Sequence, residues 1–469
     1  MVQLYEDQDD LVARVRQAMR GSKRVLMQAC TGAGKTQMTA NMMAGTKAKG
    51  TSSMMVVPRK ELLRQTIMTV ESYDMPFGVI SPDHRPQPFA RCQIAMGPTL
   101  ARRLDRVAAP NVLFIDECHY GGAELDRIIK WAMAAGSWIV GMSATPMKTN
   151  GQPMGEWYDV MVEGLPMADL IQLGRLSEYR YFAPSAPDLS GVATRDGEFV
   201  KSQLDAAMEQ DSVLIGNAVS TYKDHAPGRL NTVFCTSRKH AGIVAQAFRD
   251  GGVPSATIDG TMGDDQRGEI IRAFARREIL ALCNVDLLTF GFDLSAAADM
   301  DVTVECMSDL RPTKSLPLQL QKWGRVLRRK PFPAIILDHA GNAARHGLPD
   351  DPREWSLDGK KKRAGGGDRS EPVRQCEIAS GGCGFVHRPS PSCPNCGRVY
   401  PVASRMVEER EGTLAEIRRG EVVHRKKEQG RADTLEDLIA VGRARGMANP
   451  TGWARHVMAG REANKLARG

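Results

Sequence analysis

Short apolar runs, many of them rich in β-branched residues, alternate with longer amphipathic stretches through the first three quarters of the chain. Runs of this length are typical of buried β-strands, and the stretches between them have helical spacing. Strands that alternate with helices predict an α/β fold with parallel sheets covered on both faces. We expect strands at residues 24–28, 53–57, 112–115 and 138–141, and again at 232–235, 256–258, 279–283, 302–306 and 334–337.

The predicted strands fall into two blocks, which indicates two domains at residues 1–165 and 166–345. A polar, Pro- and Gly-containing segment at 184–197 is expected to be a loop near the entry to the second block. A basic, Gly-rich linker (346–370), a cysteine-rich module (371–403) and a basic helical tail (404–469) are expected to follow. The length of 469 residues agrees with several domains, since one hydrophobic core rarely serves so long a chain.

Composition narrows the class of protein. Hydrophobic residues make up 42% and charged residues 25% of the chain, as in ordinary globular proteins. No apolar run approaches the roughly 20 residues that cross a bilayer, and the acidic N-terminus lacks the order of a signal peptide. We therefore expect a cytoplasmic protein with no membrane partner. Six of the ten cysteines stand singly, as reduced thiols would in that compartment.

The net charge of +8 is concentrated near the C-terminus. Residues 351–469 contain 23 Lys and Arg against 16 Asp and Glu, whereas the first 350 contain 40 against 39. A basic tail on a nearly neutral body is typical of proteins that meet a polyanion. A solvated surface would explain the same charge, so both interpretations stay open here.

The stretch Ala29–Thr36, Ala-Cys-Thr-Gly-Ala-Gly-Lys-Thr, lies between a predicted strand and a predicted helix, the context of a phosphate-binding loop. Its glycines let backbone N–H groups face a phosphate at a helix N-terminus. Lys35 is expected to reach the β- and γ-phosphates, and Thr36 to hold Mg²⁺. Ala29 replaces the first glycine of the usual pattern. The residues expected to bind ATP here are Thr31, Gly32, Ala33, Gly34, Lys35 and Thr36.

A second motif, which is acidic, follows the predicted strand at 112–115. Its sequence is Asp116-Glu117-Cys118-His119. The carboxyl end of a buried parallel strand is where ligand-binding side chains gather. Asp116 would hold Mg²⁺ and Glu117 would orient and deprotonate the attacking water. The alternative is that the paired acids only cap a helix.

Together with Ser143-Ala144-Thr145 and the stretch at 321–328, Gln-Lys-Trp-Gly-Arg-Val-Leu-Arg, these motifs resemble superfamily 2 DEAD/DEAH-box helicases of the DExH type. The resemblance covers about residues 4–345 and implies two tandem RecA-like P-loop domains with an ATP site between them. It implies that 143–145 couple hydrolysis to nucleic-acid binding.

The second predicted domain would complete the ATP site. A guanidinium supplied from another domain stabilises the charge that develops on the γ-phosphate during hydrolysis. Arg325 and Arg328 are three residues apart and so share a helix face; the resemblance implies that they are these arginine fingers. It implies further that Gln321 meets the site near His119, that Gln8 reads the adenine edge, and that Gly291 and Asp293 contact the nucleotide, although Phe290 departs from the family's acid.

The resemblance also implies a nucleic-acid track across both domains, built from strand-end amides, hydroxyls and arginines that bind phosphates without reading bases. Its expected contacts are Pro58, Arg59, Thr99, Thr236, Ser237 and Thr289. The stretches at 337–342 and 345–349, together with a four-cysteine module and the C-terminal segment, resemble phage and prophage helicases. This resemblance favours DNA over RNA and replication or recombination proteins as partners. The alternatives are an RNA helicase, since no residue identifies a 2′-hydroxyl detector, and a DNA-binding ATPase switch that loads partners without unwinding.

Four cysteines crowd together in the C-terminal module, at Cys376, Cys383, Cys393 and Cys396. Four thiolates with a tight second pair predict a closed, structural Zn²⁺ site in a zinc-ribbon-like module. The first pair is spaced more widely than usual, so His387 is an alternative ligand to a cysteine. Free surface cysteines are the other interpretation.

Overall fold

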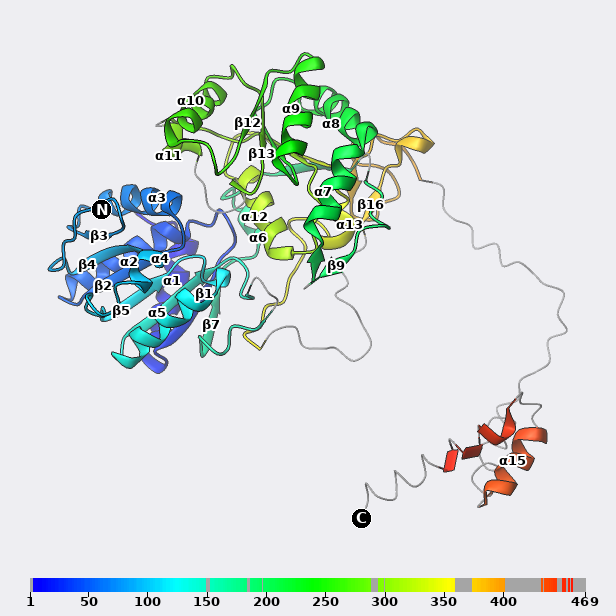
Figure 1. Cartoon of the computed structure of the whole chain (residues 1–469), viewed down its shortest axis with the longest axis horizontal. Coiled ribbons are helices and arrows are strands. Elements are labelled where there is room, and N and C mark those ends of the chain that lie inside the picture. The colour runs from blue at the N-terminus through cyan, green and yellow to red at the C-terminus, as the bar shows by residue number, and fades with distance from the viewer. Residues whose placement is uncertain are drawn as a thin grey trace. The chain divides into compact units, whose positions relative to one another are not determined.

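The computed structural model describes residues 3–148, 152–183, 186–195, 197–287, 294–298, 300–358 and 373–400, and in the tail 432, 434–444, 449–452, 454–455 and 457–458. Its contacts divide the chain into two compact units, Met1–Pro401 and Val402–Gly469. The first unit contains both large sheets and the cysteine module (Figure 1). The second contains α15 (Leu435–Ala444), where Leu438 packs with Ala432 and Ala454.

The first unit begins with an α/β lobe, called lobe 1, in which seven parallel strands have the order β3-β4-β2-β5-β6-β1-β7. Helices lie in most of the connections between successive strands, as is usual for parallel pairing. The elements of lobe 1 are α1 (Glu6–Gly21), β1 (Arg24–Gln28), α2 (Lys35–Ala48), β2 (Ser53–Val57), α3 (Lys60–Glu71), β3 (Gly78–Ile80), β4 (Cys92–Met96), α4 (Gly97–Ala101), β5 (Val112–Ile115), the short 3-10 helix η1 (Cys118–Tyr120), α5 (Ala123–Ala134), β6 (Trp138–Ser143) and β7 (Val160–Glu163).

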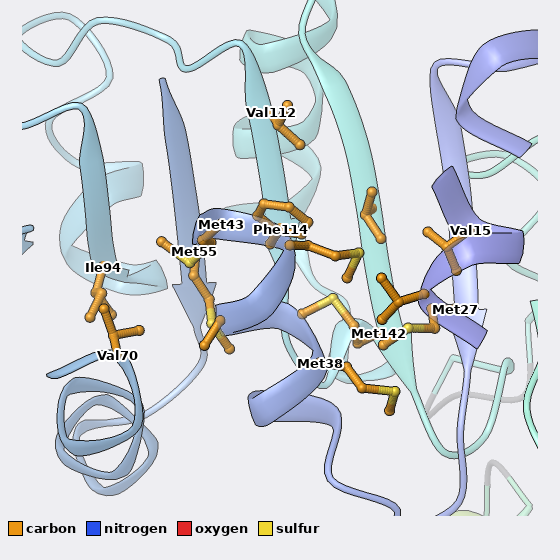
Figure 2. Packing of buried hydrophobic residues seen from close by; sticks show 14 of the residues in the cluster. Val15, Met27, Met38, Met43, Met55, Val70, Ile94, Val112, Phe114 and Met142 are labelled. Carbon is orange, nitrogen blue, oxygen red and sulfur yellow. The ribbon is translucent and has the colours of Figure 1, made fainter. Parts of the chain in front are cut away.

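Alternate side chains of the lobe 1 strands enter two different cores. On β5, Phe114 packs with the α1–α2–α3 side of the sheet, whereas Leu113 packs with the side that carries α5. Figure 2 shows the first core, where Met38 and Met43 of α2 face strand residues such as Met55. Because both faces are buried, the strands are apolar throughout, which is why the sequence pattern predicts them well.

A second α/β lobe, called lobe 2, has six parallel strands in the order β12-β13-β11-β14-β15-β8, also with a core on each face. Its elements are α6 (Met167–Gln172), β8 (Tyr179–Phe182), β9 (Thr194–Arg195), β10 (Glu198–Phe199), α7 (Lys201–Gln210), α8 (Ser212–His225), β11 (Asn231–Phe234), α9 (Arg238–Asp250), β12 (Ser255–Ile258), α10 (Asp264–Ala275), β13 (Ala281–Asn284), α11 (Leu294–Ala298), β14 (Cys306–Asp309), α12 (Leu316–Val326), β15 (Ala334–Asp338) and α13 (Asn342–His346). Two such sheets are the expected tandem RecA-like arrangement, so the fold class is confirmed.

Two of the predicted elements disagree with the structure. The strand expected at 302–306 is wrong: β14 spans Cys306–Asp309. The pairing of β14 with β11 and β15 places polar Ser308 and Asp309 in the strand, where tertiary contacts override the preference of the β-branched run before it. The segment expected to be a loop at 184–197 contains β9, which pairs antiparallel with β10 in a short hairpin.

The chain after α13 crosses back to lobe 1. Trp355 packs against the core of lobe 2, and Leu357 packs against that of lobe 1 and accepts backbone hydrogen bonds from Met154 and Gly155. The cysteine module follows with β16 (Arg374–Gln375), the 3-10 helix η3 (Ile378–Ser380) and β17 (Val386–His387). It pairs with β8 at the edge of the lobe 2 sheet.

Candidate active site

The phosphate loop begins where β1 ends at Gln28 and finishes at the N-terminus of α2. Gly32 and Gly34 have φ angles of 90° and 85°, in the left-handed region that side chains rarely adopt. Gly34 is the N-cap residue of α2, so the free amides of that helix point into the loop. The predicted strand, loop and helix are therefore present, with an anion-binding geometry.

Gln8 of α1 is attached to this loop. Its Nε2 donates to the carbonyl of Ala33 over 2.8 Å, and its Oε1 accepts from the backbone N–H of Tyr5 over 3.1 Å. An added Cβ on Gly34 would lie 2.5 Å from the Gln8 Nε2, so the loop and the amide are in close contact. Gln8 thus lies at the expected site, and its reading of an adenine edge stays a prediction.

The acidic motif lies at the carboxyl end of β5, opposite the loop lysine. Lys35 Nζ is 3.9 Å from Glu117 Oε1. Burial and the neighbouring Glu117 raise the pKa of Asp116 to about 7. Glu117 has φ of 46°, a strained value for a residue with a side chain, and such strain is typical of functional sites. A cation held here would favour the ionised form of Asp116.

His119 joins this acidic motif to the Ser-Ala-Thr segment. Its Nδ1 is 3.0 Å from Ser143 Oγ and 3.3 Å from Glu117 Oε2. Ser143 Oγ also accepts from the backbone N–H of Thr145, and Gln28 Nε2 donates to the carbonyl of Ala144. The segment at 143–145 is thus bonded both to His119 and to the strand that leads into the phosphate loop.

The two lobes meet at the same histidine. Gln321 of α12 donates from Nε2 to His119 Nε2 over 3.1 Å, and Tyr120 donates its hydroxyl to Gln321 Oε1 over 2.9 Å. Burial lowers the pKa of His119, which agrees with a neutral ring that accepts at Nε2 and carries its proton on Nδ1. The expected approach of Gln321 to His119 is therefore present.

A steric contact between the lobes accompanies these hydrogen bonds. Gly324 of α12 lies so close to the phosphate loop that an added Cβ would be 2.3 Å from Thr31 Cβ. The backbone of α12 therefore contacts the phosphate loop directly, because Gly324 has no side chain to separate them.

Arg325 lies in the last turn of α12, and Arg328 lies two residues beyond the end of that helix. Both line a small cavity of lobe 2 together with residues such as Thr232 and Phe234 of β11. Their action on a γ-phosphate stays a prediction. Thr289, Gly291 and Asp293 lie outside the described residues.

The expected nucleic-acid contacts lie at strand ends in both lobes, with different exposure. Pro58 and Arg59 follow β2, and Arg59 is exposed. Thr99 and Thr236 are buried, and Ser237 caps α9 by accepting from His240 N–H. The Thr236 hydroxyl lies 3.2 Å from His240 Nδ1, so it and Ser237 already have partners within the fold. All these nucleic-acid contacts stay predictions.

A cleft of about 690 Å³ lies beside Arg59, between α3 of lobe 1 and α10 of lobe 2. Lys60 spans it, with its Nζ 3.2 Å from Asp83 and 3.7 Å from Asp264. These exposed charges mark a point where the lobes can separate at little energetic cost.

Comparison with known protein families agrees with this geometry. Residues 1–148 match the model of the type III restriction enzyme res subunit, and residues 214–330 match that of the helicase conserved C-terminal domain. The two matches correspond to the two lobes, and the motifs stand in the order expected for the family. The chain belongs to the superfamily 2 helicases of the DExH type. It is accordingly an ATP-hydrolysing enzyme.

Two relatives extend over most of this helicase. A 51.5 kDa protein of a Lactococcus phage (isolate 7-9) is 27% identical over 384 residues, which cover 81% of this chain and 76% of the phage protein. IRC3 of Saccharomyces cerevisiae (strain ATCC 204508 / S288c), provisionally named an ATP-dependent helicase, is 25% identical over 348 residues. That match covers 68% of this chain and 48% of IRC3, so the chain spans about half the length of the yeast relative.

Solved helicase structures share the fold. The type ISP restriction-modification enzyme LlaBIII bound to DNA has a TM-score of 0.53 and 13% identity, covering 71% of this chain and 27% of LlaBIII. S. cerevisiae Dbp5 bound to RNA has a TM-score of 0.50 and 13% identity, covering 72% of this chain and 88% of Dbp5. In the described residues no helix combines the length and apolarity that a membrane crossing needs.

The four cysteines of the C-terminal module are gathered in one cluster, with all four sulfur atoms within 4.8 Å of one another. His387 has other partners: its Nε2 is 2.7 Å from the Tyr400 hydroxyl and its Nδ1 is 2.6 Å from the carbonyl of Arg388. The cluster that could hold a metal is thus the four-cysteine set.

Three residues near the nucleotide site were not predicted from the sequence. Tyr120 follows the acidic motif directly, and its place there is the one local signal that could have identified it. Tyr5 carries the guanidinium of Arg175 over its ring at 3.7 Å, and Arg175 pairs with Asp7 over 2.9 Å. Arg175 lies in the second half of the fold, 168 residues from Asp7, so no local pattern could join them.

Proposed function

We propose that this helicase couples Mg-ATP hydrolysis to movement along DNA. The observation that carries the proposal is the hydrogen bond between His119 of lobe 1 and Gln321 of lobe 2. His119 also contacts Ser143 and the acid Glu117, so a change at the phosphates can alter the contact between the lobes. A bistable contact of this kind converts nucleotide binding and release into motion of one lobe against the other.

Each group of the site has a defined role in hydrolysis. Lys35 and the loop amides would hold the phosphates, and Thr36 and Asp116 would hold Mg²⁺, which neutralises phosphate charge. Glu117 would orient water and accept its proton, since it lies beside Lys35 at the buried end of β5. Arg325 and Arg328 would approach the γ-phosphate as the lobes close.

Several observations favour DNA as the track. A phage relative matches over most of the chain, LlaBIII is bound to DNA in its structure, and the C-terminal region is basic. Dbp5 is bound to RNA in its structure, which keeps RNA as the second candidate. Replication or recombination proteins are the proposed partners, because a phage helicase that moves on DNA would act in those processes.

The discriminating experiment measures steady-state ATP hydrolysis with single-stranded DNA, duplex DNA, forked DNA and RNA in parallel. Stimulation by DNA together with displacement of an annealed or triplex-forming strand supports the proposal. Stimulation by RNA alone would reassign the track. DNA-stimulated hydrolysis without displacement of any strand would favour a switch that loads partners.

The role of Glu117 has its own test. Glu117→Gln should retain ATP binding and lose nearly all hydrolysis, because the amide cannot accept a proton from water. Glu124→Gln, which changes an exposed acid in the first turn of α5, is the matched control. Undiminished turnover in Glu117→Gln would exclude Glu117 as the general base.

The cysteine cluster fits a structural Zn²⁺ site. A tetrahedral ion with Zn–S bonds of about 2.3 Å requires sulfur separations of roughly 3.8 Å. The separation is 3.7 Å between Cys376 and Cys396, and 3.8 Å between Cys383 and Cys393. Asn395 Nδ2 also donates to the sulfur of Cys383 over 3.2 Å, as groups around a thiolate do. Bound zinc would hold the module in the shape that pairs with β8.

A further inference from the structure

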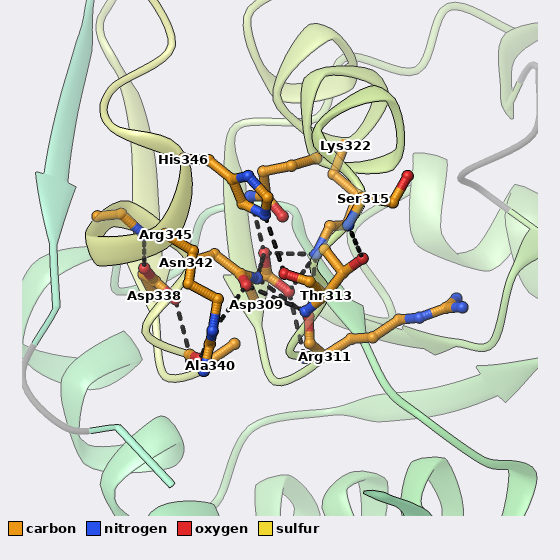
Figure 3. Close-up of polar contacts among 12 residues, drawn as sticks. Asp309, Arg311, Thr313, Ser315, Lys322, Asp338, Ala340, Asn342, Arg345 and His346 are labelled. Atoms are coloured by element: carbon orange, nitrogen blue, oxygen red, sulfur yellow. Dashed lines mark hydrogen bonds and ion pairs between the residues drawn. The ribbon is translucent and has the colours of Figure 1, made fainter. Parts of the chain in front are cut away.

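A lysine and an aspartate are completely buried behind the helix that meets the phosphate loop. Lys322 of α12 and Asp309 at the end of β14 each have 0% side-chain exposure. The Lys322 Nζ lies 2.7 Å from both carboxylate oxygens of Asp309 and donates also to the carbonyl of Arg311 over 3.1 Å. Figure 3 shows the Lys322 side chain descending from its helix onto Asp309.

The partners of Asp309 are equally complete. Its Oδ2 accepts from Gln319 Nε2 over 3.1 Å and from Asn342 Nδ2 over 3.0 Å. The nearby Asp338 is satisfied separately, by the backbone N–H groups of Ala340 and Ala343 and by a tyrosine hydroxyl. A buried ion pair is tolerated only when its remaining donors and acceptors are paired in this way. Such a network allows the helix one position, since displacement would leave a buried charge unpaired.

The network also fixes the loop that leads into α12. Asn342 Oδ1 accepts from Thr313 N–H over 3.2 Å, and the His346 ring lies 2.9 Å from the Thr313 carbonyl. Glu198 of the β9–β10 hairpin accepts from the backbone N–H of Lys314 over 2.9 Å. Two elements outside α12, the helix α13 and the β9–β10 hairpin, thus hold the loop that precedes its N-terminus.

The anchored face of α12 differs from the face that meets lobe 1. At about 100° per residue, Gln321 and Gly324 are roughly 60° apart on the helix, whereas Lys322 points about 100° away from Gln321 and about 160° away from Gly324. The side of α12 that carries Lys322 is therefore bonded to lobe 2, while the side that carries Gln321 and Gly324 contacts His119 and Thr31 of lobe 1.

We infer that Lys322 is a positioning residue for ATP hydrolysis, whose pairing with Asp309 sets the place of α12 and so of Gln321 and Arg325. This inference rests on the proposed function, because it assumes that α12 supplies groups to the ATP site. The Lys322 ammonium bonds to the Asp309 carboxylate and the Arg311 carbonyl, which all belong to lobe 2, so its effect on hydrolysis passes through the helix.

A second ion pair on the same strand provides a matched control. Glu305, directly before β14, pairs with Arg277, while Asp309 at the other end pairs with Lys322. Both acids are buried, but Arg277 is half exposed and donates to Glu305 and to the Gly228 carbonyl rather than to α12. Arg277→Met therefore removes a lobe 2 ion pair without touching the helix.

The experiment compares Lys322→Met, Lys322→Arg, Arg277→Met and Arg325→Ala in the full chain. Thermal melts first establish a temperature at which every variant is folded. We expect Lys322→Met to lower kcat at least about tenfold with KM for ATP within about twofold, because a displacement near 1 Å is costly in catalysis. Lys322→Arg should recover part of kcat, and Arg277→Met should keep kcat. If Lys322→Met does not fold, Asn342→Ser takes its place, with a smaller loss of kcat in the same direction.

The possible outcomes distinguish failure of the positioning role of Lys322 from failure of the proposed function. Normal kcat in Lys322→Met, with Arg325→Ala inactive, overturns the positioning role and leaves the proposed function standing. Equal loss of kcat in Lys322→Met and Arg277→Met overturns it as well, since general destabilisation would then explain both. Normal kcat in Arg325→Ala would show that Arg325 does not act as an arginine finger, and it would contradict both proposals.

Discussion

Substitution of Gly324 by alanine gives a quantitative test of the contact between the lobes. The new Cβ would lie 2.3 Å from Thr31 Cβ, whereas carbon atoms in contact are separated by about 3.5–4.0 Å. The helix and the phosphate loop must therefore move apart by roughly 1.2–1.7 Å. If the same displacement applies to Gln321, its 3.1 Å bond to His119 lengthens well beyond the range of a hydrogen bond.

The expected result is a loss of turnover without a loss of folding. A misplacement of this size costs on the order of 100-fold in rate when reacting groups must be aligned. ATP binding should change little, because the loop amides, Lys35 and Thr36 all belong to lobe 1. Alanine is favoured over glycine within a helix by about 1 kcal/mol, so the melting temperature should be maintained unless overpacking offsets that gain.

The assay is steady-state ATP hydrolysis over a range of ATP and DNA concentrations, with thermal melts of the same preparations. Gly242→Ala on α9 is the matched control, since an added Cβ there has nothing within 4 Å. It should show the helix-propensity gain and normal kcat. A Gly324→Ala enzyme with wild-type kcat would refute the reasoning, because hydrolysis would then proceed without close contact of α12 and the loop.

Three further predictions concern the periphery of the site. The purified protein should contain one zinc per chain, and Cys393→Ser should lose it and lower the melting temperature, because the module pairs with β8; wild-type protein free of zinc would contradict this. Deletion of 402–469, the second unit, should weaken DNA binding and reduce its salt dependence, since it removes 14 Lys and Arg against 10 Asp and Glu; an unchanged salt slope would exclude it as a DNA contact. Burial lowers the pKa of His346 to about 4, so its contribution to stability is lost as pH falls from about 6.5 toward 4. The stability advantage of wild type over His346→Gln, measured by urea unfolding, should shrink over that window by on the order of 1 kcal/mol per pH unit, and a constant difference would contradict it.

Much of the fold follows from the sequence because the central strands are buried on both sides. The strands β1, β2 and β5 have the limits that the apolar runs predict. β14 was misplaced because its position depends on pairing with β11 and β15, which are distant in sequence. Four strands of the two large sheets were missed: β3, β4, β7 and β8. β3, β7 and β8 are edge strands, whose single neighbour leaves a weak apolar signal, whereas the run of β4 is interrupted by polar Gln93.

The chemistry of the site was predictable where residue type and order along the chain suffice. The phosphate loop and the acidic motif each lie at the carboxyl end of a strand. Because the strands are parallel, these ends meet at the same edge of the sheet and the two motifs lie close to each other. The contact of His119 with Gln321 spans 202 residues, and only the family resemblance suggested it. Gln8 illustrates the limit, because its motif indicated an adenine contact while the structure shows its amide bonded to the phosphate loop.

Lys322 shows why position in the motif does not determine what a charged residue does. Between residues 321 and 328 the sequence contains Lys322, Arg325 and Arg328, three basic groups that a helical pattern alone would place on a solvated or phosphate-facing surface. The structure removes Lys322 from solvent and pairs it with Asp309. Desolvating that lysine costs several kcal/mol, and only a fully bonded partner at one fixed place offsets this cost. A surface lysine would leave α12 free to shift against its sheet, whereas the buried one makes any shift of the helix break the pair. The burial of a charge, invisible in the sequence, is thus the physical reason why α12 can transmit a small movement at His119 to the whole of lobe 2.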